Sequence, residues 1–203
     1  MLEIETSNCS EAQVFRLPEL LASYGRFHCD PRNRMTHYFG VPLIVYALLV
    51  AAALPAIEFG GMRVPLERVL LGLLVLWYLV LDLRLGLVLA LVLAGLAWAA
   101  EATLGASPGL ALPIAGGVFV LGWVLQLAGH HLEGNRPALV TNLGQIFVAP
   151  IYLTAELTFA LGLRAPLAAA VRERQQVPLR AGGTGSRPPH PAPAGPRPGR
   201  SGS

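Results

Sequence analysis

The sequence contains no lysine, and only 13% of its 203 residues are charged. Soluble domains carry charge on about a quarter of their residues, so this scarcity argues against a water-soluble domain. Only two cysteines are present, Cys9 and Cys29, and their number and spacing exclude a disulfide framework and a zinc ribbon. The N-terminal residues include acids and lack an apolar stretch, so we expect no cleaved signal peptide.

Basic charge is also scarce outside the C-terminal tail. Residues 178–203 contain four arginines, no acid, seven prolines and six glycines, a composition that predicts disorder. The preceding 177 residues contain eleven arginines and twelve acids and are nearly neutral. Because no basic surface interleaved with aromatic residues accompanies the charge, we expect no nucleic acid partner.

Apolar residues make up 54% of the chain and gather in four long runs. A 20-residue helix is about 30 Å long, the thickness of the hydrocarbon core of a bilayer, whereas the two middle runs reach about 24 Å each. The sequence therefore predicts an all-α integral membrane helical bundle with about four transmembrane helices. The runs are Tyr38–Ile57, Leu66–Leu81, Leu85–Ala100 and Leu110–Gly129.

Polar residues between and after these runs indicate how they are connected. Asp82 and Arg84 separate the two middle runs and predict a tight helical hairpin, since charges in mid-membrane cost several kcal/mol. We expect interfacial or re-entrant helices at the N-terminus and in the segment 139–163. That segment is apolar on average but contains Asn142, Gln145, Pro150 and Glu156.

The arginines indicate how the bundle is oriented. With four spans and both termini on one side, thirteen of the fifteen arginines lie on that side, which the positive-inside rule makes cytoplasmic. A fifth crossing would leave only six arginines there, so we predict that the C-terminal segment does not cross. The chain divides into a polar extension (1–14), a membrane domain (15–177) and the tail (178–203).

Four of the five histidines fall at the cytoplasmic ends of the predicted spans. His28 lies just before Pro31, where a helix should end because proline lacks an N–H donor and restricts the preceding residue. A corner here allows His28 and His37 to meet, whereas one unbroken helix would place them on opposite faces. His130 and His131 lie at the end of the last span.

Polar residues near the histidines are candidates for holding the ring nitrogens that face away from a metal. His130 and Glu133 share one helical face, a spacing used by metal sites in helical bundles. Three or four imidazoles with an optional carboxylate suit Fe(II), Zn or Cu, while a bis-histidine haem and simple interfacial hydrogen bonding stay open as alternatives. The residues one turn before His28, His37 and His130 are Tyr24, Asn33 and Gln126.

Arg136, directly before Pro137, has two interpretations. It can mark the end of the last helix and contact lipid headgroups. It can also bind a substrate carboxylate through a bidentate pair. Both interpretations stay open on the sequence.

Two blocks of the sequence closely resemble the fungal 2-hydroxy fatty acid dioxygenase family and its bacterial relatives. The resemblance covers roughly residues 15–170, with the blocks at opposite ends of a hydrophobic middle. The first block is Tyr24-x3-His28, Asp30-Pro31-x-Asn33-x3-His37 and Gly40-x-Pro42. The second is Trp123-x2-Gln126-x2-Gly129-His130, Arg136-Pro137-Ala138-Leu139, Asn142-Leu143, Gln145 and Ala149-Pro150.

The resemblance implies an Fe(II)-dependent, haem-free membrane enzyme that uses O2 to shorten a 2-hydroxy fatty acid by one carbon, in α-oxidation. We expect a bacterial inner membrane as the location, with both termini and the histidines cytoplasmic as the arginine distribution indicates. The oligomeric state stays open. The metal ligands would be His28, His37 and His130, with His131 as a fourth. We expect Tyr24 or Arg136 to orient the substrate carboxylate, supported by Asn33, Gln126, Glu133 and Asn142.

The alternative interpretation is a non-enzymatic membrane scaffold or lipid-binding protein whose histidines are interfacial. Its tail, rich in proline and arginine, would recruit a partner or anionic headgroups. A transporter is disfavoured, because the predicted spans contain no ionisable residue near the midplane and no internal repeat. Stoichiometric iron without a Soret band would distinguish the dioxygenase from a haem protein and from the scaffold.

Overall fold

The computed structural model describes residues 8–134 and 144–176. This part of the chain forms seven helices and one β-hairpin, so the predicted all-α class is confirmed apart from two short strands. The strands are β1 (Ala56–Phe59) and β2 (Met62–Pro65). The helices are α1 (Asn8–Gly25), α2 (Pro31–Ala53), α3 (Leu66–Leu81), α4 (Leu83–Ala106), α5 (Ala111–Glu133), α7 (Gln145–Ala160) and α8 (Ala165–Gln176).

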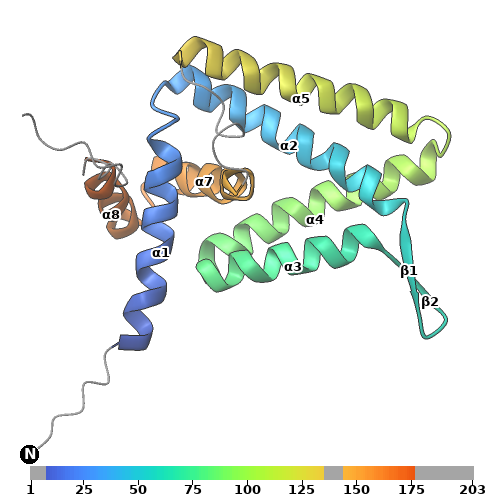
Figure 1. Cartoon of the computed structure of the whole chain (residues 1–203), viewed down its shortest axis with the longest axis horizontal. Helices are drawn as coiled ribbons and strands as arrows, with labels where there is room; N and C mark the ends of the chain where they lie inside the picture. Colours follow the sequence, from blue (N-terminus) through green and yellow to red (C-terminus); the bar gives the residue numbers. More distant parts are fainter. Residues whose placement is uncertain (1–7, 135–143, 177–203) are drawn as a thin grey trace, which may run out of the picture.

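The helices from α2 to α5 run alternately back and forth (Figure 1). α2 and α5 lie side by side, and α3 and α4 form a second antiparallel pair. The β-hairpin and the α4–α5 connection lie at one end of the bundle, which we call the hairpin end. The start of α2 and the end of α5 lie at the other end, which we call the Glu133 end. A chain that crosses a membrane repeatedly has this alternation.

Three helices, α2, α4 and α5, are long and apolar enough to cross a membrane, with 23, 24 and 23 residues. The pair α7 and α8 adds a fourth if it is one span broken by its bend of 118°. α3 was predicted as a span, but its 16 residues make about 24 Å of helix and fall short of that length. α4 is longer than its apolar run because the helix continues through Glu101 to Ala106.

The predicted corner at Pro31 is present. α1 ends at Gly25 and α2 begins at Pro31, whose fixed φ angle suits the first turn of a helix. The Asp30 side chain caps α2 by accepting a hydrogen bond from the Arg32 amide at 2.8 Å. The chain therefore changes direction between His28 and the rest of α2.

The first predicted span was too long at its C-terminal end. α2 stops at Ala53, because Pro55 cannot continue the hydrogen bonding of a helix. Ile57 lies in β1 and pairs with β2 across a turn at Gly60 and Gly61, whose φ angles are 58° and 79°. Positive φ at both central residues is the geometry of a tight two-residue hairpin turn.

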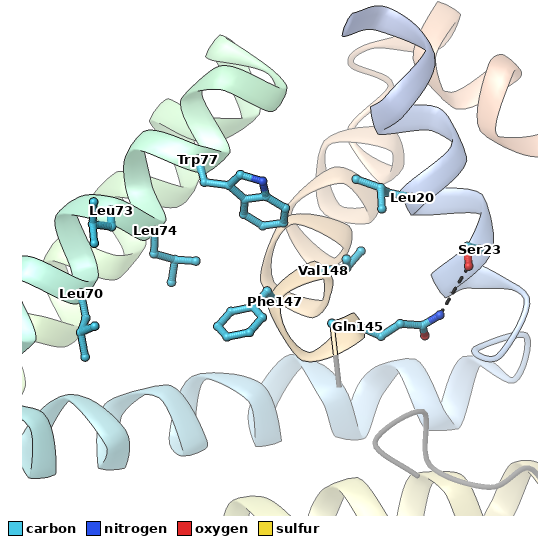
Figure 2. Close-up of a pocket in the computed structure, with 10 residues that line it drawn as sticks. Leu20, Ser23, Leu70, Leu73, Leu74, Trp77, Gln145, Phe147 and Val148 are labelled. Atoms are coloured by element: carbon cyan, nitrogen blue, oxygen red, sulfur yellow. Dashed lines mark hydrogen bonds between the residues drawn. The ribbon is translucent and has the colours of Figure 1, made fainter. Parts of the chain in front are cut away.

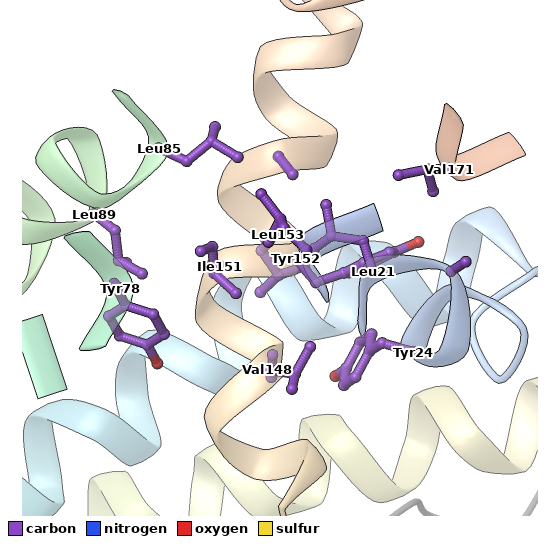
Figure 3. Close-up of a cluster of buried hydrophobic side chains, with 14 of the residues drawn as sticks. Leu21, Tyr24, Tyr78, Leu85, Leu89, Val148, Ile151, Tyr152, Leu153 and Val171 are labelled. Carbon is purple, nitrogen blue, oxygen red and sulfur yellow. The ribbon is translucent and has the colours of Figure 1, made fainter. Parts of the chain in front are cut away.

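α7 lies in the middle of the larger cluster of buried hydrophobic side chains (Figure 3). Six of its residues between Val148 and Ala155 are buried, and it contacts α1, α2 and α4. An apolar helix that is buried on most sides needs neighbours around it. Side chains that surround it include Leu21 and Tyr24 from α1, Tyr78 from α3, and Leu85 and Leu89 from α4.

The break between α7 and α8 is tied to the turn between α3 and α4. Arg164 Nη1 donates a hydrogen bond to Asp82 Oδ1 at 3.0 Å, and Nη2 donates to Oδ2. Asp82 Oδ1 also accepts from the Leu85 amide at 2.9 Å and caps α4. The predicted hairpin turn is confirmed, and one carboxylate joins α4 to the start of α8.

Candidate metal centre

Three glycines allow α2 and α5 to pack closely; we call Gly40, Gly122 and Gly129 the glycine seam. A Cβ atom at Gly122 would lie 3.0 Å from the Gly40 carbonyl oxygen and 2.7 Å from Ile44 Cγ1. A Cβ atom at Gly129 would overlap the Thr36 hydroxyl. Small residues are the usual means of close helix approach in membranes. The seam therefore sets how near the ends of the two helices come.

Three histidines meet at the Glu133 end of this seam. His28 comes from the α1–α2 corner, His37 from α2 and His130 from α5, and their exposed fractions are 2%, 2% and 5%. One ring nitrogen of each lies within 4.8 Å of the others. The ring centroids are 4.6 to 5.2 Å apart, and the ring planes cross at 65° to 85°. Ligand atoms that surround a single ion have this kind of arrangement.

Two of the rings are held by their own stretch of backbone. His28 Nδ1 lies 2.9 Å from the Tyr24 carbonyl oxygen, and His37 Nδ1 lies 2.8 Å from the Asn33 carbonyl oxygen. A carbonyl oxygen can only accept, so each Nδ1 carries the proton and donates it. In the neutral ring, the Nε2 atom is then left with a lone pair.

These two Nε2 atoms face each other at 3.2 Å. With both protons on Nδ1, no hydrogen bond joins them, and two lone pairs at this distance repel unless a cation attracts both. Burial opposes a positively charged ring here: it lowers the pKa of His28 to about 4, and the nearby His130 adds to the decrease. A metal ion would satisfy both lone pairs at once.

His130 adds a third imidazole, and one of its ring nitrogens, Nδ1, is buried and has no hydrogen-bond partner among the described residues. Leaving a buried polar atom unpaired costs about 1–3 kcal/mol, so such atoms point to a missing partner. Three imidazoles without a thiolate suit Fe(II), Zn or Cu, and the residues present fit such an ion.

Glu133 ties the end of α5 to the α1–α2 corner. Its Oε1 accepts hydrogen bonds from the backbone amides of Cys29 and Asp30, the latter at 3.0 Å, and its Oε2 accepts from the Asn33 side chain. A carboxylate here also compensates the positive end of the α2 dipole. Both oxygens are engaged, so Glu133 positions the corner together with Asn33, whose carbonyl holds His37.

Two tyrosines pack against His28. The Tyr24 ring stacks on the His28 ring, with centroids 4.1 Å apart and planes 3° from parallel. The Tyr152 ring of α7 lies 4.7 Å from Tyr24 and 6.2 Å from His28. Burial raises the pKa of Tyr24 above its usual value, and Tyr152 adds to the increase. The Tyr24 hydroxyl therefore stays neutral and can donate a hydrogen bond.

Comparison with known proteins identifies the family. The family model described as 2-hydroxy-palmitic acid dioxygenase Mpo1-like matches residues 14–161, which is more than half of the chain and includes all three converging histidines. The chain belongs to the Mpo1-like family. It is 30% identical over 162 residues to the 2-hydroxy-palmitic acid dioxygenase MPO1 of Saccharomyces cerevisiae, covering 79% of this chain and 90% of that protein. No solved structure matches the chain. The resemblance based on the two sequence blocks is confirmed.

The predicted ligands of this Mpo1-like chain do not all lie together. His131 is exposed and does not belong to the group of ligand atoms formed by its neighbour His130 and the other two histidines. Successive residues of an α-helix are about 100° apart, so only one of two adjacent histidines can face the group. The predicted residues Arg136 and Asn142 lie outside the described residues.

Two of the three residues one turn before the histidines hold a histidine ring. Tyr24 and Asn33 hold the rings through their backbone carbonyls instead of their side chains. Gln126 is buried at the α2–α5 contact, where its Nε2 would lie 3.0 Å from a Cβ atom at Gly40.

Two contributions to the Mpo1-like site were missed from the sequence. Tyr152 lies in an apolar stretch with no motif that would single it out. The glycine seam had a signal, because Gly122 and Gly129 are seven residues apart and so share one face of α5.

Proposed function

We propose that this protein is a membrane dioxygenase that uses O2 to shorten a 2-hydroxy fatty acid by one carbon in α-oxidation, with Fe(II) as its cofactor. The observation that carries the proposal is the meeting of three buried imidazoles from distant parts of the chain, in a family named for 2-hydroxy-palmitic acid dioxygenases. The residues that would hold the iron are His28, His37 and His130. The name of the yeast relative supports the substrate class.

The chain's own residues would bind and orient the substrate. When bound, Fe(II) with three imidazole ligands keeps open positions and supplies the redox chemistry of O2. Tyr24 lines a cavity of about 120 Å³ together with Gln126 and mostly apolar side chains. Its neutral hydroxyl would donate a hydrogen bond to the substrate carboxylate, and the apolar walls would keep water away. Arg136 is proposed as the ionic partner of the same carboxylate.

The ring geometry favours a single ion over a haem. The Nε2 atoms of His28 and His37 are 3.2 Å apart, which leaves no room for a porphyrin between them. Among the ions that suit three imidazoles, Fe(II) is proposed because the reaction of the family uses O2.

We also propose that the Glu133 end faces the cytoplasm of a bacterial inner membrane. The support is the arginine distribution. If α2, α3, α4 and α5 are the four crossings, thirteen of the fifteen arginines lie on this side. The histidine group would then lie at the cytoplasmic side of the membrane.

The experiment is anaerobic purification of the full chain in detergent, followed by iron quantification, a visible spectrum, and incubation with 2-hydroxypalmitate and O2. We expect stoichiometric iron, no Soret band, and formation of the acid one carbon shorter with consumption of O2. His37→Ala should remove both the iron and the activity, because it deletes one of three ligands.

His131→Ala is the matched control, since it deletes an adjacent imidazole that lies outside the group. We expect it to keep its iron and activity. A Soret band would contradict the proposal in favour of haem, and absence of metal from folded protein would support the scaffold. Undiminished iron and turnover in His37→Ala would also overturn it.

A further inference from the structure

A large groove lies between α1, α3 and α7 (Figure 2). Its volume is about 550 Å³, which is within the usual range of about 300–1,000 Å³ for small-molecule sites. None of its lining residues is charged. Most of the wall is made of the apolar side chains Leu20, Leu70, Leu73, Leu74, Trp77 and Phe147. Several of these side chains are exposed, so the groove is open along α3.

One part of the groove wall is polar. Ser23 of α1 and Gln145 of α7 lie there, and Gln145 Nε2 donates a hydrogen bond to Ser23 Oγ at 3.4 Å (Figure 2). The Gln145 Oε1 atom is buried and has no hydrogen-bond partner within the described part of the chain. A buried amide oxygen needs a donor, and no apolar neighbour can supply one. A ligand O–H group would meet this need.

Gln145 also connects the groove to the candidate metal centre. It lines the smaller cavity of about 120 Å³ that contains Tyr24 and Gln126. Tyr24 in turn stacks on His28. A continuous path of neighbouring residues therefore leads from the open apolar groove, past the Gln145 amide and the small cavity, to the buried histidines.

We propose that the groove between α1, α3 and α7 binds the alkyl chain of the substrate, and that Gln145 binds the substrate hydroxyl as the polar end passes toward the histidines. The proposal rests on the proposed function for the identity of the substrate. A single-chain acid with one polar end is the occupant that fits, because the two polar side chains of the wall, Ser23 and Gln145, lie together in one part of a largely apolar groove. An unhydroxylated acid would leave the Gln145 oxygen unpaired.

The first test is a binding measurement that needs no turnover. Trp77 lines the groove, whereas Trp98 of α4 is 73% exposed and does not. Full-length protein in detergent, with either Trp77 or Trp98 as its only tryptophan, is titrated with 9,10-dibromostearic acid, whose bromines quench indole fluorescence on contact. We expect saturable quenching of Trp77, displaced by 2-hydroxypalmitate but not by 2-hydroxybutyrate. For Trp98 we expect only weak quenching that does not saturate.

The second test uses substitutions. Leu73 lies in the groove and is 62% exposed, so Leu73→Phe should fold while shortening the space for the chain. The matched control is Leu76→Phe, an exposed α3 position outside the groove. We expect Leu73→Phe alone to weaken displacement by 2-hydroxypalmitate more than displacement by 2-hydroxydecanoate. Gln145→Leu should lower the preference for 2-hydroxypalmitate over palmitate by about two- to tenfold, the effect of one hydrogen bond.

The outcomes separate this proposal from the proposed function. Saturable quenching with no shortened acid would overturn the dioxygenase and leave the groove as a fatty acid site. A second set of outcomes would contradict alkyl-chain binding in the groove while leaving the dioxygenase in place. These are turnover by the enzyme, equal quenching in the two single-tryptophan proteins, and an unchanged chain-length preference in Leu73→Phe. An unchanged preference for the hydroxylated acid in Gln145→Leu would overturn the role of Gln145.

Discussion

The orientation of two histidine rings is set by hydrogen bonds to backbone atoms. His28 and His37 are each held by the carbonyl four residues earlier, from Tyr24 and Asn33. The sequence predicted the position of these partners, because residues four apart share a helical face. It could not identify the atom, since every residue offers a carbonyl while the side chains serve other contacts. The Asn33 amide, for example, donates to Glu133.

Glu133→Gln is expected to weaken iron binding by about 10- to 100-fold, the usual effect of disturbing residues that orient metal ligands. The carboxylate accepts from two backbone amides and from Asn33, and an amide side chain replaces one acceptor with a donor that faces donors. The measurement is iron occupancy at limiting metal, with circular dichroism to verify folding.

The control for this variant is Glu101→Gln, which removes a carboxylate from the exposed ion pair with Arg68 near the hairpin end. We expect its iron occupancy to equal that of the unmodified chain, because exposed pairs contribute about 1 kcal/mol or less. Equal occupancy in Glu133→Gln would show that the α1–α2 corner holds its shape without the carboxylate.

Among the helices and strands, the sequence predicted boundaries best where charge or proline interrupts a run. The α3–α4 turn at Asp82 and the corner at Pro31 are such places. The β-hairpin was missed although Gly60 and Gly61 are a turn signal, because the apolar run continues to Ile57 and run length alone favoured a helix. α4 continues past its apolar run because helical hydrogen bonding does not stop at the first polar residue.

Gly129→Ala is expected to move α5 away from α2. We expect its iron content to fall by a larger fraction than its thermal midpoint. The new Cβ atom would overlap the Thr36 hydroxyl and the Asn33 side chain, and such overpacking costs about 1–3 kcal/mol. The matched control is Gly116→Ala on the same helix, where an added Cβ atom meets nothing within 4 Å. Thermal unfolding and iron content are measured for both variants, and equal losses in the two would contradict the role of the seam.

Asp82→Asn is expected to destabilise the bundle by roughly 1–3 kcal/mol, because it leaves Arg164 without its carboxylate. Burial works against ionisation of Asp82, but hydrogen bonds from Arg164 and Leu85 and the charge of Arg164 hold the pKa of its carboxyl below the usual value. Asparagine still caps α4, so the variant removes the charge and keeps the cap.

The same ion pair predicts a pH dependence of the thermal midpoint. Since the folded-state pKa of Asp82 is lowered, its stabilisation is present above the unfolded pKa of about 3.9 and is lost as pH falls through the folded value. Below about pH 4 the difference between Asp82→Asn and the unmodified chain should therefore shrink. A constant difference from pH 7 to pH 3 would argue against the ion pair as its cause.

For the whole molecule, the alternation of helices was predictable and the position of α7 was not. Apolar runs and arginine counts determine how often and in which direction a chain crosses, because the bilayer sets both constraints. Those signals say nothing about which helix the larger hydrophobic cluster forms around, which here is α7. The choice of His130 over His131 is likewise a matter of packing, since it depends on which face of α5 meets α2.

Chemical labelling tests the proposed orientation. Cys29 is exposed at the Glu133 end, and Met62 is exposed at the hairpin end. In a Cys9→Ser background, a membrane-impermeant maleimide should label Cys29 in inside-out vesicles and spare it in intact spheroplasts. With Cys29→Ser and Met62→Cys the pattern should reverse. The opposite pattern in both proteins would show that the Glu133 end faces away from the cytoplasm.

The split origin of the three histidines has a consequence for biosynthesis. His28 and His37 leave the ribosome early, and His130 follows only after the β-hairpin, α3 and α4 have been made. A nascent chain interrupted before α5 carries two imidazoles and lacks the third. It therefore lacks the full set of proposed ligands, which is complete only once α5 has packed beside α2.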